Sequence, residues 1–249
     1  MAKSDEYRRV LASLEEWDSF LLQESGLPGP RGNLELAQAV ADVGDEALFE
    51  RYRSLDAGRA PANSPHEFLA FCGVLGLGRL LAGGRRDVLP VLRRCASDPR
   101  WRTREAVAMA LQRLGDADMG ALLDEMELWS AGNPLEQRAA AAALCEPRLL
   151  RDAAVVVRVL DVLDGITASL QDAADRRGDA FQALRQGLGY CWSVAVAAYP
   201  KVGKARMERW LVSHERDVRW IMRENLRKKR LERVDADWVA AWRKLLGAG

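Results

Sequence analysis

Histidine and paired cysteines are scarce in this sequence, and their scarcity excludes several kinds of site. The two histidines, His66 and His214, stand in no recognisable setting for a Ser or Cys nucleophile and its base. The four cysteines are widely separated and form no C-x-x-C pair: Cys72, Cys95, Cys145 and Cys191. We therefore predict reduced cysteines in the core, no metal, no cofactor and no catalytic residue of a familiar kind.

Long hydrophobic runs are also absent. The longest apolar stretches, such as SVAVAAY at 193–199, are far shorter than the roughly 20 residues that span a bilayer. The segment MAKSDEYRRV at 1–10 is charged and leads straight into amphipathic sequence, without the apolar core and small-residue cleavage site of a signal peptide. These features predict a cytoplasmic protein that makes no use of a membrane.

The composition is otherwise that of an ordinary folded chain. Of 249 residues, 49% are hydrophobic and 29% charged, enough to bury a core in one large domain or one continuous array. Apolar residues recur at helical spacing and no segment alternates as an exposed strand does. Glycine and proline punctuation predicts helices at 5–24, 34–43, 45–55, 65–82, 86–96, 101–114, 119–130, 134–145, 152–164, 167–176, 179–198, 202–213, 217–231 and 235–246.

One motif occurs twice with the same spacing. SDPRWRTREAVAMAL carries Asp98, Arg100, Trp101, Arg104 and Glu105, and RDVRWIMRENLRKKRL repeats them as Asp217, Arg219, Trp220, Arg223 and Glu224. GDAFQALRQGLGYCW is a weaker copy with Asp179, Arg185 and Gln186, and NPLEQRAAAAAL from Asn133 is a degenerate one. An amphipathic helix precedes most copies, so the repeat unit is a helix, a tight turn with Asp, and a second helix with an Arg near its start.

The physical role of the motif follows from its position. We expect the carboxylates of Asp98 and Asp217 to accept from free N–H groups of a helix's first turn, where Pro99 needs no partner. This pattern resembles the HEAT/armadillo class over residues 86–234. The resemblance implies an all-α fold, a right-handed α-α superhelix (solenoid) of HEAT-like helical pairs. It also implies a ladder of ion pairs between the turn Asp of one unit and the second-helix Arg of its neighbour.

The resemblance also sets the expected domain organisation. We predict one HEAT-like repeat domain over residues 1–249, with an N-terminal capping helix and loop at 1–33, the clearest repeats at 86–234 and a C-terminal capping helix at 235–249.

Positive charge gathers at the C-terminal end. Residues 201–249 hold 14 Lys and Arg against 7 Asp and Glu, a net +7, which leaves 23 against 29, or −6, for residues 1–200. On one helix from Asp217, four arginines would lie within a stripe of about 80°: Arg219, Arg223, Arg227 and Arg230. Lys228 and Lys229 add to the field, and Arg216 extends it across the turn. We take these seven residues as candidate anion- or nucleic-acid-binding residues.

A structural explanation of the same residues stays open. Arg223 would then belong to the inter-repeat ladder, Arg219 would pair with Glu215 or Asp217, and the remaining cations would form the polar cap of a terminal repeat.

Two further features are interpreted as structural. Six tryptophans lie on the predicted helices: Trp101, Trp192, Trp210, Trp220, Trp238 and Trp242. Most of them are expected to fill the core between repeats, and an exposed one could anchor a partner. The glycine-rich segment FCGVLGLGRLLAGGRRD follows no strand and precedes no Lys-Ser/Thr, so it is not a phosphate loop. We expect Gly73, Gly76 and Ala82 to permit close helix packing, with Gly83 and Gly84 ending the helix.

Two functions fit these observations. The first is a non-catalytic scaffold that binds a macromolecular partner, because nothing in the sequence requires an enzyme. The second is a protein that binds a nucleic-acid backbone, since the chain distantly resembles the HEAT-like bacterial DNA alkylation-repair glycosylases. That resemblance implies DNA as partner and base excision as activity. The chain lacks the family's W-W-D-x-V-D-type segment, so only fold and DNA-backbone affinity carry over. The repeat alone also resembles the HEAT-like phycobilin lyases.

Overall fold

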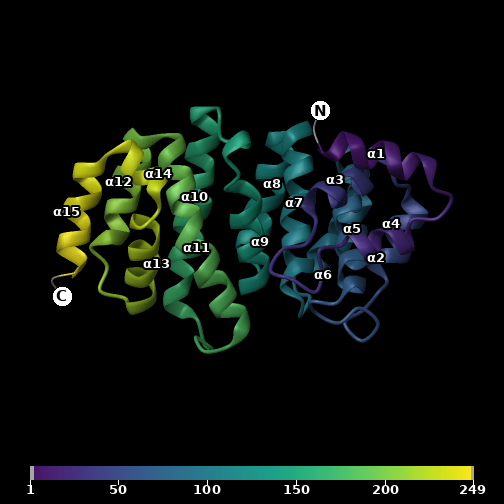
Figure 1. Cartoon of the computed structure of the whole chain (residues 1–249). Coiled ribbons are helices and arrows are strands. Elements are labelled where there is room, and N and C mark those ends of the chain that lie inside the picture. Colours follow the sequence, from purple (N-terminus) through teal and green to yellow (C-terminus); the bar gives the residue numbers. More distant parts are fainter. Residues whose placement is uncertain (1–2, 248–249) are drawn as a thin grey trace. The chain divides into compact units, whose positions relative to one another are not determined.

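The computed structural model describes residues 3–247, and within that range all regular structure is helical and no strand occurs (Figure 1). Contacts divide the chain into two compact units, an N-terminal unit that ends at Asp118 and a C-terminal unit that begins at Met119. The predicted all-α class is thereby confirmed. The predicted single domain over 1–249 stays a prediction, and its ends at 1–2 and 248–249 lie outside the described residues.

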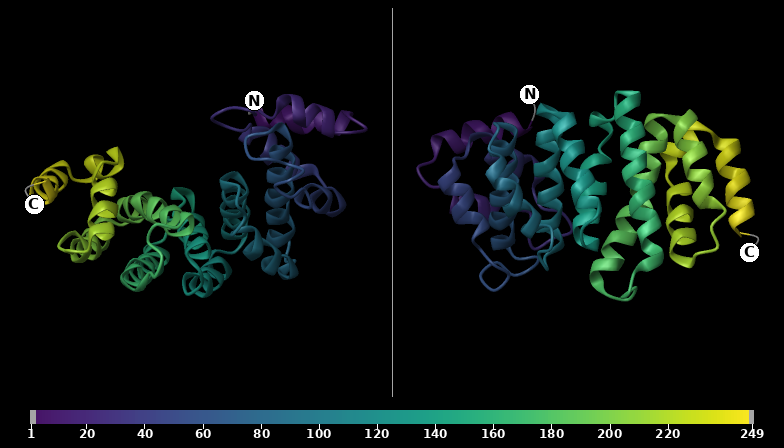
Figure 2. Two further views of the ribbon diagram at one scale, coloured as in Figure 1. Left: turned by 90° about the horizontal axis from the view of Figure 1, so that it is seen from below. Right: turned by 180° about the vertical axis from the view of Figure 1, so that it is seen from behind.

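The N-terminal unit is built around one long central helix. The helix α5 packs against α2, α3, α4 and α7, while α1 covers α3 (Figure 2). Its elements are α1 (Lys3–Ser13), α2 (Asp18–Glu24), α3 (Leu34–Val43), α4 (Glu46–Arg53), α5 (Pro65–Ala82), the 3-10 turn η1 (Arg86–Val88), α6 (Leu89–Cys95) and α7 (Trp101–Ala117).

Glycines let α5 approach its neighbours closely, as predicted. A Cβ at Gly73 would lie 2.3 Å from the backbone nitrogen of Arg53, and one at Gly76 would lie 2.2 Å from the ring of Phe49. A Cβ cannot occupy such positions, so α5 packs directly against the backbone of α4 at Gly73 and against the Phe49 ring at Gly76. Gly84, with φ of +97°, follows the end of the helix in a left-handed conformation.

The C-terminal unit consists of four successive helix pairs, α8/α9, α10/α11, α12/α13 and α14/α15. The first helices α8, α10 and α12 pack side by side, and so do the second helices α9, α11, α13 and α15. The elements are α8 (Met119–Ser130), α9 (Pro134–Leu144), η2 (Pro147–Leu149), α10 (Ala153–Ser169), η3 (Leu170–Asp172), α11 (Asp179–Ala198), α12 (Pro200–Leu211), α13 (Arg216–Leu226), α14 (Lys229–Val234) and α15 (Ala236–Gly247).

Side-chain caps begin several helices where the sequence has Asn, Asp or Ser. Asn133 accepts from the N–H groups of Leu135 and Glu136 and forms a capping box with Glu136 at the start of α9. Ser64 and Asp152 cap α5 and α10 with their side-chain oxygens, which accept from backbone N–H groups of the first turn. These capping residues fix where α5, α9 and α10 begin, and so they define the turns that precede those helices.

Four predicted helices differ from the structure. Residues 152–164 and 167–176 were expected as two helices, but α10 continues through Gly165 to Ser169 because its buried face, including Leu163 and Ile166, continues unbroken. Residues 5–24 form two helices, α1 and α2, and the indole of Trp17 donates to the carbonyl of Leu11 in the bend. The helix predicted at 217–231 ends at Leu226.

Candidate functional site

The two copies of the repeated motif occupy different positions on their helices. Asp98 lies before α7, where its carboxylate accepts from the N–H of Arg100 at 2.8 Å and pairs with the guanidinium of the same residue at 2.7 Å. Arg100 precedes the first residue of α7, and the helix begins without a side-chain cap, so the predicted capping role of Asp98 is wrong. Asp217 lies inside the first turn of α13 and is 2% exposed, while Glu215 accepts from the N–H of Val218 as the cap. The predicted capping role of Asp217 is therefore wrong.

Asp217 instead joins neighbouring repeats. Its carboxylate pairs with Arg185 of α11 at 2.9 Å and with Arg176, from the turn before α11, at 3.1 Å. The guanidinium of Arg185 also stacks 3.9 Å from the ring centre of Trp220. This Arg–Asp pair is the inter-repeat contact that the resemblance implies, formed by an Arg of one repeat and the Asp of the next. Arg223, which the structural explanation assigned to the same ladder, does not take part in it.

A second series of ion pairs joins the first helices of the C-terminal unit. Arg158 of α10 reaches Asp124 and Glu127 of α8 at 2.8 and 2.7 Å. Arg206 of α12 in turn reaches Asp161 of α10 at 2.8 Å. Each helix thus presents acids to an arginine of the next first helix. The resemblance to HEAT repeats implies ladder contacts only between the turn and the second helix.

The predicted arginine stripe is interrupted. Because α13 ends at Leu226 and α14 begins at Lys229, only Arg219, Arg223 and Arg227 share one face, and Arg230 lies on a different helix. The end of α13 is held by a distant side chain, since Arg243 of α15 donates to the carbonyl of Leu226 at 2.6 Å.

Arg223 has a structural role of the same kind. Its guanidinium donates to the carbonyl of Leu246 near the end of α15, so α13 and α15 each supply an arginine to the last carbonyls of the other. The two arginines line a shallow hollow of roughly 610 Å³ together with Trp220. Reciprocal capping of this sort joins α13 to α15, and it occupies one donor of Arg223, which is otherwise exposed.

The remaining predicted cations fall into two groups. Arg216 and Arg227 are well exposed, with 85% and 73% of their side chains accessible, and Arg227 pairs with Glu224 at 2.7 Å. Arg219 is half-buried and Lys229 exposed, and neither forms an ion pair with the described residues. These four present positive charge on α13 and α14.

Lys228 and Arg230 turn toward Tyr190 of α11. The guanidinium carbon of Arg230 lies 4.4 Å from the centre of the tyrosine ring and the ammonium of Lys228 lies 5.9 Å from it. Arg230 also donates to the tyrosine hydroxyl. Tyr190 is itself 43% exposed, so this cluster is a cationic and aromatic surface beside the exposed face of α13.

The tryptophans depart from the expectation of a common core role. Of the six on the predicted helices, Trp192 is fully buried, four are half-buried, and Trp101 is 50% exposed. Trp101 and Trp220 share one motif position but not one environment, because Trp220 lies under Arg185 whereas Trp101 opens to solvent. The shared position therefore does not imply a shared role.

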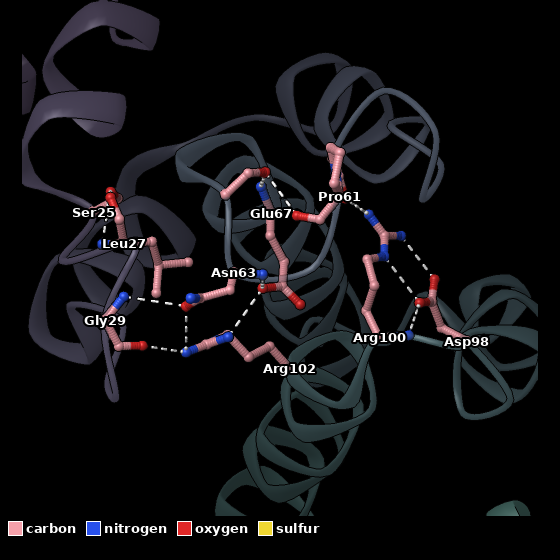
Figure 3. Close-up of polar contacts among 11 residues, drawn as sticks. Ser25, Leu27, Gly29, Pro61, Asn63, Glu67, Asp98, Arg100 and Arg102 are labelled. Carbon is pink, nitrogen blue, oxygen red and sulfur yellow. Dashed lines mark hydrogen bonds and ion pairs between the residues drawn. The ribbon is translucent and has the colours of Figure 1, made fainter. Parts of the chain in front are cut away.

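Trp101 lies beside a buried polar network that the sequence analysis did not identify. Arg102, 6% exposed, pairs with the fully buried Glu67 at 3.1 Å and donates to the carbonyl of Gly29 at 2.7 Å (Figure 3). Asn63 links the same groups, since its side-chain oxygen accepts from the N–H of Gly29 and its own N–H donates to Glu67 at 2.7 Å. The network fastens the loop at 25–33 to the starts of α5 and α7.

This fastened loop forms one wall of a pocket of roughly 530 Å³ in the N-terminal unit. The buried rings of Phe68 and Phe71 and the guanidinium-stacked indole of Trp101 contribute apolar surface. The lining consists of Leu27, Pro30, Arg31, Gly32, Leu34, Phe68, Phe71, Trp101, Arg102 and Glu105. In the sequence this loop read only as a break between helices, because nothing local signals its contacts with α5 and α7.

Three of the four cysteines are buried and Cys95 is half-buried, and all four are free thiols. Burial raises the pKa of the Cys72 thiol, which keeps it protonated at neutral pH. Among the described residues, no three His, Cys, Asp or Glu side chains gather as possible metal ligands, and no helix is long and apolar enough to cross a bilayer.

Comparison with known proteins identifies the helical repeat and leaves the partner undefined. Residues 70–145 match the family model of HEAT repeats. No curated protein and no solved structure matches the chain significantly. The resemblance to the DNA alkylation-repair glycosylases is therefore not confirmed. Over residues 70–145 the chain is similar to HEAT-repeat proteins, and its helical pairs are those of an α solenoid.

Proposed function

We propose that this protein is a non-catalytic scaffold that binds a macromolecular partner in the cytoplasm. The observation that carries the proposal is the side-by-side packing of α9, α11, α13 and α15, in which α11, α13 and α15 each keep exposed residues as an extended surface. Helical-repeat proteins use such surfaces for recognition, and the HEAT match supports the same reading.

The two buried acids Glu67 and Asp217 and the half-buried Asp164 support a non-catalytic role. Glu67 is engaged by Arg102, Asp217 by Arg185, and Asp164 accepts from the indole of Trp210 at 2.6 Å. An acid that acts in catalysis has to face a substrate, whereas each of these carboxylates is directed at another helix or turn of its own unit. Their charges hold the repeats in place.

Affinity purification of the full chain from cells that contain it naturally tests the scaffold. We expect a discrete protein to co-purify and to form a complex of fixed stoichiometry when both proteins are mixed in purified form, measured by size-exclusion chromatography with light scattering. Loss of all bound material after nuclease treatment would contradict a protein partner. It would favour the second function instead.

A nucleic-acid backbone is the second candidate partner, and the cations on and beside α13 and α14 favour it. Arg216, Arg219, Arg227 and Lys229 carry positive charge beside the Tyr190 cluster of Lys228 and Arg230. Rows of accessible cations next to an aromatic ring suit phosphates and stacked bases.

The test of nucleic-acid binding substitutes residues whose loss should not destabilise the fold. Arg216→Glu with Lys229→Glu changes two exposed side chains, whereas Arg223→Glu would also remove the cap on α15. By fluorescence anisotropy with a short DNA duplex, the double variant should bind more weakly, and its dependence on salt should lessen by about one counterion per lost phosphate contact. Arg31→Glu, an exposed arginine of the N-terminal unit, is the control. Absence of duplex binding at low salt would eliminate this candidate.

A further inference from the structure

The pocket beside Trp101 has features of a binding site rather than of a packing defect. Three large hydrophobic side chains are exposed in the described part of the N-terminal unit: Leu34, Val43 and Trp101. Two of them, Leu34 and Trp101, line this pocket, at 43% and 50% exposure. Exposed apolar groups that gather around a concavity indicate a surface that another molecule covers.

The pocket is formed before any partner arrives. Phe68 and Phe71 are held in the core with their rings stacked 6.5 Å apart, and they are 2% and 4% exposed. On the opposite wall, the loop at 25–33 is fixed by Arg102 and Asn63 through the carbonyl and N–H of Gly29. A rigid wall lowers the entropy lost on binding, so a small apolar group can bind with useful affinity.

The charges around the pocket specify what lies next to that apolar group. Arg31 is exposed and forms no ion pair with the described residues. Arg102 is neutralised by Glu67, and Glu105, the acid of the lining, also has an interaction within the chain. The available charge at the rim is therefore the guanidinium of Arg31, which complements a carboxylate.

We propose that this pocket anchors a segment of a partner protein that carries a bulky apolar side chain next to an Asp or Glu. The apolar side chain lies between Trp101 and the ring of Phe68, and the carboxylate pairs with Arg31. The inference rests on the proposed scaffold function and names the partner's chemistry. A volume of roughly 530 Å³ suits one aromatic or aliphatic anchor with part of its backbone.

A displayed library of random peptides, selected on the immobilised full chain and counter-selected on its Trp101→Glu variant, tests the proposal. We expect the enriched peptides to share an apolar residue adjacent to Asp or Glu. Their affinities are then measured by fluorescence anisotropy. Because Trp101 is half exposed, Trp101→Ala should leave the fold intact while weakening binding by at least about 10-fold. Circular dichroism and thermal unfolding of the variant check its folding.

The charge is tested by a paired substitution. Arg31→Glu should weaken an Asp-containing peptide by about 10-fold and leave its Asp→Asn counterpart nearly unchanged, which a structural effect of the variant would not do. Arg151→Glu and Leu128→Ala are controls, since both residues are exposed in the C-terminal unit and neither belongs to this lining. Neither should alter peptide affinity.

Each contrary outcome has a distinct meaning. The pocket proposal would be overturned if the selected peptides lacked the apolar and acidic pair. It would also be overturned if neither Trp101→Ala nor Arg31→Glu changed their affinity. In both cases the scaffold function would still stand. The same holds if indole-3-acetate binds in the pocket and no peptide does, since the occupant is then a small acid. Failure to isolate any macromolecular partner in the co-purification experiment would remove the scaffold function, on which this proposal rests.

Discussion

The two copies of the D-x-R-W-x-x-R-E motif use the same residues for different contacts. In the N-terminal unit, Asp98 pairs with Arg100 of its own turn, and Arg100 donates to the carbonyls of Leu55 and Ala60 in a neighbouring loop. In the C-terminal unit, Asp217 receives two arginines from the preceding repeat. The difference arises because α13 begins one residue before Asp217, whereas α7 begins three residues after Asp98.

As a consequence, two copies of one motif need not contribute equally to the free energy of unfolding. The N-terminal unit buries the pair of Arg102 and Glu67, next to the pocket, and also the guanidinium of Arg100, which pairs with Asp98. The C-terminal unit buries the carboxylate of Asp217 and otherwise distributes its charges over partly exposed pairs between successive helices. Buried pairs are costly to break and exposed pairs are not, so the substitutions below separate the two arrangements.

The largest effect is expected at Glu67. Glu67→Gln keeps the side-chain shape but leaves the guanidinium of Arg102 buried without its counter-charge, which should lower the free energy of unfolding by about 3–5 kcal/mol. Urea unfolding followed by circular dichroism measures the loss. Glu35→Gln, at an exposed position on α3, is the control and should change little. A loss below about 1 kcal/mol would mean that Arg102 is satisfied by its carbonyl and amide partners alone.

The motif comparison itself is tested by two matched variants. Asp217→Asn removes the negative charge from a 2% exposed site that faces two arginines and should cost about 2–3 kcal/mol. Asp98→Asn should cost about 1 kcal/mol or less, because an amide oxygen can still accept the N–H of Arg100. Parallel urea titrations give both values. Equal losses would show that the two aspartates do equivalent work, contrary to the contacts described above.

The positions of helices could be predicted well because their signals are local. Asn33, Ser64 and Asn133 stand directly before α3, α5 and α9, and each helix starts where its cap predicts. The break after Leu226 has no such signal, since no glycine or proline occurs there. It depends on Arg243, a residue of a later helix, which supplies a donor to the freed carbonyl.

The two candidate sites also differ in whether local sequence could predict them. The cations of residues 216–230 could be found from charge alone, but not which of them are occupied, because Arg223 is engaged by the end of α15. The pocket beside Trp101 could not be found at all. It requires Arg102 to meet a loop 73 residues earlier in the chain, and no periodicity or spacing encodes that contact.

The next effect depends on pH. Burial of Glu215 would raise the pKa of its carboxyl, but the N–H of Val218 and the guanidinium of Arg176 outweigh it, and the pKa is lowered overall. A lowered pKa in the folded state adds stability above the unfolded value of about 4.3 that is lost as the pH falls through the folded pKa. Glu215→Gln should therefore be less stable than the parent protein at pH 7.

The difference in stability between Glu215→Gln and the parent protein should narrow as the pH falls below about 4. The parent carboxyl is then protonated and is as neutral as the Gln amide. Thermal unfolding over a range of pH measures the gap. A difference in stability that stays constant down to pH 3 would assign the effect to the lost cap alone. Asp179→Asn, which changes an exposed acid at the start of α11, is the reference variant.

The smallest effect is expected in the series between first helices. Arg158 bridges α10 to Asp124 and Glu127 of α8, but 38% of its side chain and 73% of that of Asp124 are exposed to solvent. Water and salt screen such a pair, and ordering the long side chain opposes it, so Arg158→Ala should cost between about 0 and 1 kcal/mol. The same urea titration as for Asp217→Asn, repeated in 1 M NaCl, measures it. If the loss instead equals that of Asp217→Asn, the ion pairs between first helices contribute as much as the buried pair, and burial does not distinguish the two ladders.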